Sequence, residues 1–178
     1  IGAAALEPGE AGNLQIDWTI ATKGDLPWNK IVNGQPLVNK AIITNIETKG
    51  NAAPLNMADW FNGYTALTTF DGSGLDTSFC SNFSNVLANN TALTSINISS
   101  WNTRGASASD RDMFAGSTAL EYLILGPNVD LTGTNLNLLP GHGTDDGTWT
   151  RQDAPNDTWL GSSQGLMDRY NGPGSEGE

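Results

Sequence analysis

The sequence predicts a short α/β solenoid, in which parallel strands stack one on the next between an N-terminal cap and a small C-terminal closing module. Two observations predict this class. The tripeptide Thr-Ala-Leu begins at Thr65, Thr91 and Thr118, so the copies lie 26 and 27 residues apart. After each copy, apolar and polar residues alternate, as they do along a strand with one buried face.

The three copies align over residues 60–78, 86–104 and 113–131. The apolar positions that coincide are Leu67, Leu93 and Leu120, and then Phe70, Ile96 and Leu123. A period of about 20–29 residues with this strand core is typical of leucine-rich repeats. One such unit cannot bury its own leucines, so we expect about three of them to stack in parallel.

The alternation predicts which side chains face outward. In the middle copy Leu93, Ile96 and Ile98 should point into the core. We expect the outward set to be Thr69, Asp71, Ser95, Asn97, Ser99, Tyr122 and Ile124. The open sheet of a solenoid is an extended binding surface, so these residues are the candidate ligand-binding site. The alternative for Ile124 is that a cap or the loop after Gly126 covers it.

The flanking regions complete the predicted organisation. Residues 1–56 form an N-terminal capping region, residues 57–140 the leucine-rich repeats, and residues 141–178 the closing module and linker. Trp60 and Trp101 stand in the aligned frame and should belong to the core, since a tryptophan is more often partly buried structure than a ligand platform. Trp149 and Trp159 stand among polar residues, where an exposed platform is the alternative.

Several short motifs carry a resemblance to a known family. These are LDTS at 75–78, WNT at 101–103, and the pairs WF at 60–61 and MF at 113–114. Together with the LEYLILGPNVDLTG stretch from Leu120, they resemble the BspA-like leucine-rich-repeat surface proteins of Gram-positive bacteria. The resemblance extends over roughly residues 14–172, where LQIDW and KAIITNIETKG are similar to the strands before the first repeat. The expected helix that contains Leu166 and Met167 is similar to part of the closing module of that family.

The resemblance implies an exported protein attached to the cell wall, outside the cell. It implies an adhesion or interaction role, with a host or extracellular-matrix protein or glycan as partner. A structural spacer that projects another module and binds nothing itself is the alternative. The scarcity of catalytic residue types, described below, separately predicts no enzymatic activity.

The formal charge of −11 narrows the classes of partner. Nucleic-acid binding needs a basic stripe that releases counterions from phosphates, and anionic lipid also attracts basic segments. We therefore expect neither partner. The chain also has no apolar run of about eighteen residues, so no membrane insertion is expected. A solvated acidic face is the simplest interpretation of the charge, and a cationic partner or calcium is the alternative. The sequence leaves the oligomeric state open.

The residue types that catalysis needs are scarce. Cys80 is the only cysteine and His142 the only histidine, and they stand far apart in the chain. Cys80 lies among apolar residues, where a thiol usually acts as a small buried hydrophobe. Asp110 and Asp112 flank Arg111, which indicates a surface ion cluster rather than a pair of catalytic carboxylates.

A calcium site is the one metal site worth considering. The oxygen ligands would come from Asp145, Asp146, Asp153, Asn156 and Asp157. Their spacing does not match the calcium-loop pattern D-x-[DN]-x-[DN]-G. We therefore expect an acidic loop, with no metal and no cofactor.

Overall fold

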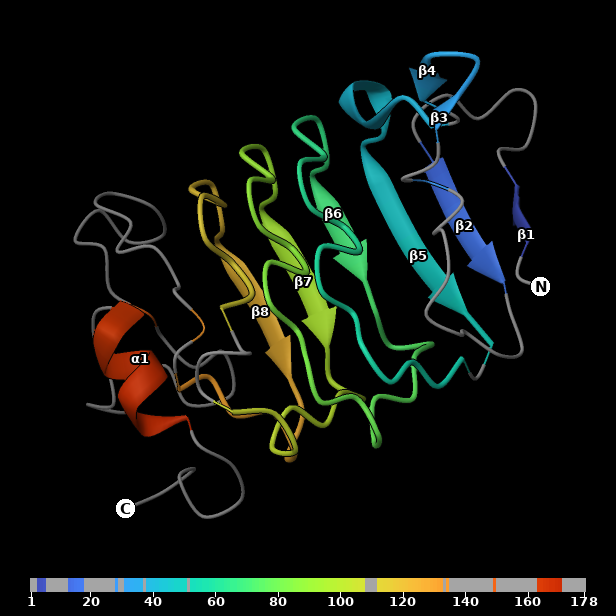
Figure 1. The fold of residues 1–178 in the computed structure, drawn as a ribbon. Coiled ribbons are helices and arrows are strands. Elements are labelled where there is room, and N and C mark those ends of the chain that lie inside the picture. The colour runs from blue at the N-terminus through green and yellow to red at the C-terminus, as the bar shows by residue number, and fades with distance from the viewer. Residues whose placement is uncertain are drawn as a thin grey trace.

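The computed structural model describes residues 3–5, 13–17, 28, 31–36, 38–50, 52–107, 112–132, 134, 149 and 163–170. Its main feature is a six-stranded sheet in the order β1-β2-β5-β6-β7-β8 (Figure 1). The strands are β1 (Ala3–Ala5), β2 (Asn13–Asp17), β5 (Asn45–Lys49), β6 (Thr69–Asp71), β7 (Ser95–Ile98) and β8 (Tyr122–Leu125). β1 is antiparallel to β2, and the other neighbours are parallel.

Among the described residues, a hairpin, a 3₁₀ turn and an α-helix lie outside this sheet. β3 (Ile31–Val32) and β4 (Gln35–Pro36) form a hairpin, η2 (Lys40–Ile42) is a single 3₁₀ turn, and α1 (Ser163–Arg169) is the α-helix. The parallel strands and few helices of the described residues are compatible with the α/β class predicted from the sequence.

The register of the strands matches the alignment of the sequence. Phe70 pairs with Ile96, and Ile96 pairs with Leu123. Phe70 and Ile96 are buried, and the residues beside them in each strand are more exposed. The predicted inward residues Leu93, Ile96 and Ile98 are all fully buried. Each such aliphatic side chain contributes about 1.5–3 kcal/mol when it leaves water.

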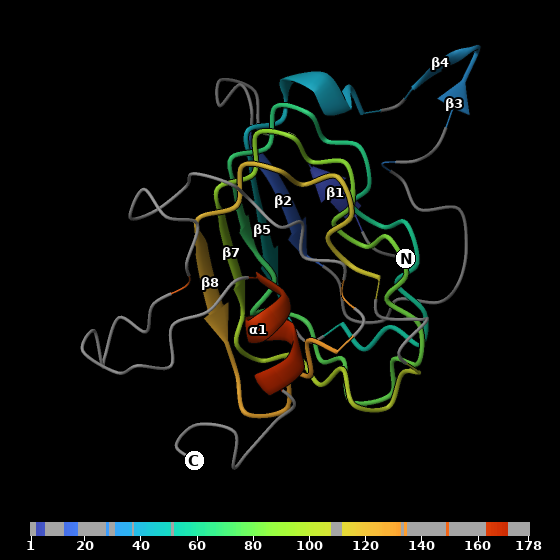
Figure 2. The same cartoon turned by 90° about the vertical axis from the view of Figure 1, so that its left-hand side faces the viewer.

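Loops cross back on the other side of the core (Figures 1 and 2). They bond to each other through the backbone, for example from Phe61 N–H to Val86 O and from Leu87 N–H to Met113 O, both at 2.9 Å. Gly63, Asn89 and Gly116 occupy the same position of the three aligned segments, and all have positive φ. Glycine and asparagine tolerate this left-handed conformation, so the same turn forms in each segment.

A buried asparagine joins the three loops. The Asn90 side-chain oxygen accepts a hydrogen bond from Tyr64 N–H at 2.7 Å, and its amide group donates to Phe61 O and Leu87 O, both at 3.0 Å. Its backbone N–H donates to the Ser117 hydroxyl at 3.1 Å, and that hydroxyl donates to Leu87 O. Tyr64, Asn90 and Ser117 each precede a Thr-Ala-Leu tripeptide. Asn90 therefore bonds to both neighbouring segments.

Two buried threonines join the segments after the strands. The Thr77 hydroxyl accepts from Asn102 N–H at 2.7 Å and donates to Asn102 O at 3.3 Å. Thr103, 26 residues further on, bonds to Asp130 N–H and O in the same way. A single hydroxyl thus satisfies both backbone groups of a residue in the next segment.

Gly72 interrupts the inward stripe of β6 and leaves room for the indole of Trp101. A Cβ at Gly72 would lie 2.7 Å from Phe70 Cε1 and 2.9 Å from Trp101 Nε1. The indole N–H also donates to Gly72 O at 2.9 Å. Trp60 and Trp101 are buried in the core, as predicted.

Each end of the core is covered by further apolar side chains. At the N-terminal end Trp28 stacks on Phe61 with ring centroids 5.7 Å apart, and its indole N–H donates to Trp60 O. At the β8 end, α1 lies between the sheet and the loops (Figure 2) and buries Leu166 and Met167.

Trp149 belongs to this closing region of the chain. It is partly buried, packs against the core and donates to the Ser163 hydroxyl at 3.0 Å. This placement gives it a structural role rather than that of an exposed platform. Trp159 lies outside the described residues.

Gly72→Ala is expected to lower the free energy of unfolding by about 1–3 kcal/mol, because the added methyl group meets two aromatic rings that are already packed. Urea titration followed by tryptophan fluorescence measures this. Gly105→Ala is the control, since its Cβ would meet only Cys80 O, at 3.7 Å. An equal loss in both variants would contradict the packing explanation.

Asn90→Ala is expected to cost about 2–4 kcal/mol, because Tyr64 N–H and Phe61 O stay buried without their partner. Asn62→Ala removes an asparagine whose side-chain bonds are exposed, and it should change stability by less than about 0.5 kcal/mol. Thermal unfolding followed by circular dichroism compares the two. Similar melting temperatures for both variants would rule out the bridging role of Asn90.

Candidate binding face of the sheet

The strand register arranges the outward side chains in two rows. The first row contains Asn45, Thr69, Ser95 and Tyr122, and the second contains Glu47, Asp71, Asn97 and Ile124. Lys49 follows the second row in β5, and Ser99 follows it after β7. Together with the two rows, these two residues make up the outer sheet face. All seven residues predicted from the sequence lie on it.

Exposure varies across the outer sheet face. Tyr122 and Ile124 in β8 keep 65% and 53% of their surface exposed, whereas Asn97 and Ser99 are half-buried. Ile124 is therefore open to solvent, and the alternative that a cap or loop covers it is wrong. Two large apolar side chains on neighbouring outward positions are more than a solvated face requires.

Three residues of this face were not among the sequence-predicted set. Asn45, Glu47 and Lys49 come from β5, which pairs with β6 in register. A signal for them exists in the sequence. Ile43 and Ile46 have the spacing of Leu67 and Phe70 and stand 24 residues before them.

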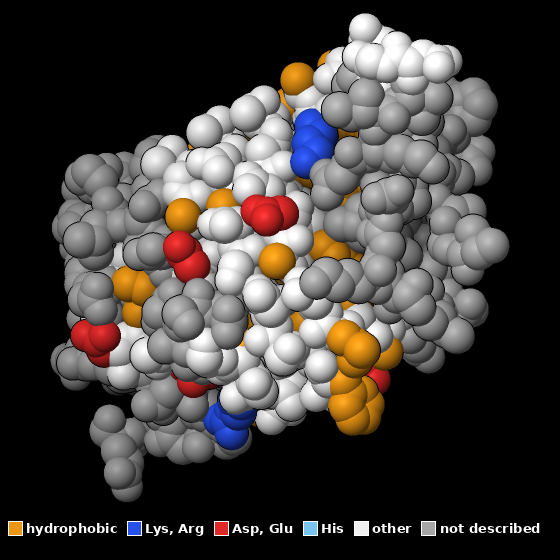
Figure 3. Space-filling model, in the orientation of Figure 1, with side chains coloured by type: hydrophobic (Ala, Val, Ile, Leu, Met, Phe, Trp, Pro, Cys, Tyr) orange, Lys and Arg blue, Asp and Glu red, His pale blue; other side chains and the backbone are white. Residues whose placement is uncertain are grey.

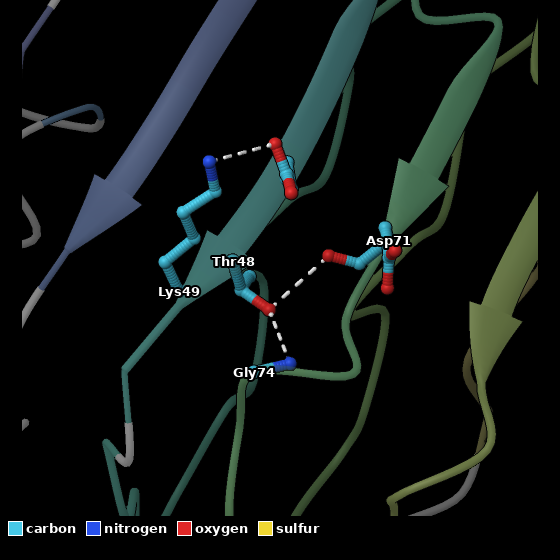
Figure 4. A network of polar contacts seen from close by, with 5 residues as sticks. Thr48, Lys49, Asp71 and Gly74 are labelled. Atoms are coloured by element: carbon cyan, nitrogen blue, oxygen red, sulfur yellow. Dashed lines mark hydrogen bonds and ion pairs between the residues drawn. The ribbon is translucent and has the colours of Figure 1, made fainter.

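The β5–β6 side of the face is acidic and partly paired. Lys49 Nζ lies 3.4 Å from a Glu47 carboxylate oxygen (Figure 4). Between the strands, the buried Thr48 hydroxyl donates to Asp71 O and accepts from Gly74 N–H, both at 3.1 Å. Thr48 thus fixes the end of β6, from which the Asp71 side chain projects.

Local hydrogen bonds use part of the polar capacity of the face. The Thr69 hydroxyl donates to the Asn45 side-chain oxygen. The Asn97 side-chain oxygen accepts from Ser99 N–H at 3.2 Å and from the Ser99 hydroxyl at 2.8 Å. One Asp71 oxygen accepts from Ser73 N–H at 2.9 Å. The bonds from Ser99 N–H and Ser73 N–H close the turns after β7 and β6. The bond between Thr69 and Asn45 instead joins β6 to β5.

Among the described residues, the groups with shifted pKa values lie away from this face. Burial lowers the pKa of Lys40, against the opposing attraction of the Asp59 carboxylate. The Lys40 ammonium donates to Asn62 O at 2.8 Å and lies 5.0 Å from the Tyr64 ring centroid. It therefore ties η2 to the next loop.

Cys80 is buried, as predicted. Burial of its thiol raises its pKa, and hydrogen bonding to backbone groups opposes this only in part. A raised pKa disfavours the thiolate that nucleophilic chemistry needs.

Within the part of the chain that the structure describes, no three His, Cys, Asp or Glu side chains gather as metal ligands. The calcium candidates at 145–157, together with His142, Asp110 and Arg111, lie outside the described residues. Asp112 is described and partly buried. Among the same described residues, no helix has the length and apolar character to cross a membrane.

Among the described residues, the side of the molecule opposite the sheet shows a few scattered charged and hydrophobic side chains, and the rest of its described surface is neither (Figure 3). The large apolar side chains exposed elsewhere in the described chain are Ile42, Leu55 and Phe79. Leu55 and Phe79 stand in the loops that follow β5 and β6, so they do not belong to the outer sheet face.

Comparisons with protein-family models, with curated proteins and with solved structures found no match to this chain.

Replacing Tyr122 and Ile124 together by serine should change the free energy of unfolding by less than about 0.5 kcal/mol for each site, because both side chains are mostly exposed. Ile96→Ala, in the neighbouring strand, should cost about 2–5 kcal/mol because it opens a cavity. Denaturant midpoints of the two variants test this. A large loss in the double serine variant would show that the β8 side chains serve folding.

Proposed function

We propose that the chain is a short leucine-rich-repeat solenoid that acts as an adhesion or interaction domain, binding a host or extracellular-matrix protein or glycan through the outer sheet face. The observation that carries this proposal is the exposure of Tyr122 and Ile124 side by side on the open face of a parallel sheet. An aromatic ring beside an aliphatic side chain is the kind of anchor around which binding energy concentrates.

The solenoid part of the proposal is supported by the constant offset between interacting residues. Bonds between neighbouring segments join residues about 26 apart in the loops, at Asn90 and at the threonines after the strands. In a solenoid each unit contacts only its neighbours, so one offset recurs along the chain.

The cellular setting follows from the resemblance to BspA-like proteins. We propose an exported domain of a wall-attached surface protein without catalytic activity. In line with this, the outer sheet face presents hydroxyl, amide and apolar groups that suit recognition, and the single cysteine is buried with a raised pKa.

A structural spacer is the second candidate, and one observation favours it. On β5 to β7 several polar side chains bond to each other, including Thr69 to Asn45 and Ser99 to Asn97. This part of the face has less capacity left for a ligand. The two candidates differ in whether the apolar residues of β8 are needed for attachment.

The test uses beads coated with the domain and surfaces coated with epithelial cells or matrix proteins. The triple variant Asn97→Ala, Tyr122→Ser, Ile124→Ser should lower attachment at least about tenfold, as expected when central anchors are removed. The matched control Leu55→Ser, Phe79→Ser removes apolar side chains outside the face and should attach as the parent does. Attachment that survives the triple variant, with circular dichroism unchanged, would favour the spacer.

A further inference from the structure

We propose that the outer sheet face binds an extended peptide segment in which a Lys or Arg and an apolar residue stand three positions apart. The cation would lie at Asp71, and the apolar side chain would pack on Tyr122 and Ile124. This inference rests on the proposed function and names the chemical class of its ligand.

The face has different chemistry at its two sides. β5 and β6 carry the carboxylates of Glu47 and Asp71, and β8 carries Tyr122 and Ile124. β7 lies between them with uncharged polar residues. A ligand that satisfies the whole face must therefore combine a positive charge with an apolar group.

The hydrogen bonds show which polar groups remain for a ligand. Lys49 lies beside Glu47, so Glu47 already has a cation. Asp71 has no cation beside it within the described residues, and only one of its two oxygens accepts an internal bond, from Ser73. The Asn97 oxygen is taken by Ser99, whereas its amide N–H groups have no internal acceptor in the described chain. From β6 to β8, the face therefore offers a hydrogen-bond acceptor at Asp71, donors at Asn97 and an apolar surface at Ile124.

The spacing of the strands selects the peptide geometry. Asp71 and Ile124 stand in one row on β6 and β8, two strand spacings or ~10 Å apart. In a polyproline II segment, residues three apart lie on one side of the helix and ~9 Å from each other. In an extended strand, residues on one side are two or four apart, at ~7 or ~13 Å, and fit this row less well. The amide N–H groups of Asn97, midway between, can donate to a peptide carbonyl.

The charge of the chain supports a cationic ligand rather than a neutral one. At −11 the protein attracts basic segments over distances of about a Debye length, which raises their rate of encounter. A neutral glycan would use the tyrosine and the amide but would not use the Asp71 carboxylate. Binding that depends on salt and on Asp71 therefore separates a peptide from a sugar.

In the experiment, four synthetic peptides are titrated into the full chain, and binding is followed by NMR. The probe is acetyl-Gly-Pro-Lys-Pro-Pro-Leu-Pro-Gly-amide, with lysine and leucine three apart. One control has glutamate for lysine, a second has serine for leucine, and a third moves leucine one position closer to lysine. The probe should shift the Ile124 methyl and Asn97 side-chain amide signals, and each control should bind at least about threefold more weakly.

Protein variants test the two proposed contacts, that of the peptide cation with Asp71 and that of the apolar residue with Ile124. Asp71→Asn should lower the affinity for the probe peptide about three- to fivefold at low salt, as expected for an exposed ion pair, and less at physiological salt. Ile124→Ser should lower the affinity for the probe peptide about tenfold at either salt concentration. Asp76→Asn removes an exposed carboxylate outside the face and should leave the affinity unchanged.

The inference is overturned if the probe shifts no signals of the face, if the glutamate peptide binds equally well, or if Asp71→Asn has no effect. Loss of attachment in the triple variant would still support the proposed function in that case. If instead the probe binds as expected while attachment survives the triple variant, the inference stands and adhesion through this face fails.

Discussion

The buried carboxamide of Asn90 is the interaction on which the rest of the structure depends. It bonds to backbone groups of the preceding segment and of its own, while the adjacent N–H bonds to Ser117 of the next. Unpaired backbone groups at this depth would cost more than most single contacts contribute. The bonds form only when each segment keeps its place relative to its neighbours, and the same offset sets the strand register and hence the rows of the outer sheet face.

This constraint separates the residues that hold the fold from those that are available for binding. Inward positions are filled by Phe70, Ile96 and similar side chains, and the loops are held by asparagine, threonine and serine. The outward positions take little part in this framework beyond the local turns and the bond between Thr69 and Asn45. Their chemistry can therefore differ from strand to strand, which produces an acidic side and an apolar side on one continuous sheet.

Much of the fold could be predicted from the sequence because burial leaves a periodic trace. The offsets of 26 and 27 residues located the strands, and their alternation placed all seven outward residues correctly. β5 was not assigned to the outer face because its segment lacks Thr-Ala-Leu and stands at a shorter offset. The choice of Asn90 rather than Asn89 as the buried residue was not predicted either, although Asn89 aligns with Gly63 and Gly116 at the position of the left-handed turn. The two are chemically identical, and only the left-handed turn at Asn89 decides which one points inward.

The packing of Trp101 against Gly72 has a consequence for how such a chain can grow or shrink in evolution. The ring that completes the interior at β6 is encoded in the following segment, about 29 positions later. Deleting that segment would leave the glycine facing an empty space, and inserting a segment that lacks tryptophan at this position ahead of it would do the same. A rearrangement of the coding sequence would therefore preserve the packing at this position only if the glycine and the tryptophan stay in adjacent segments.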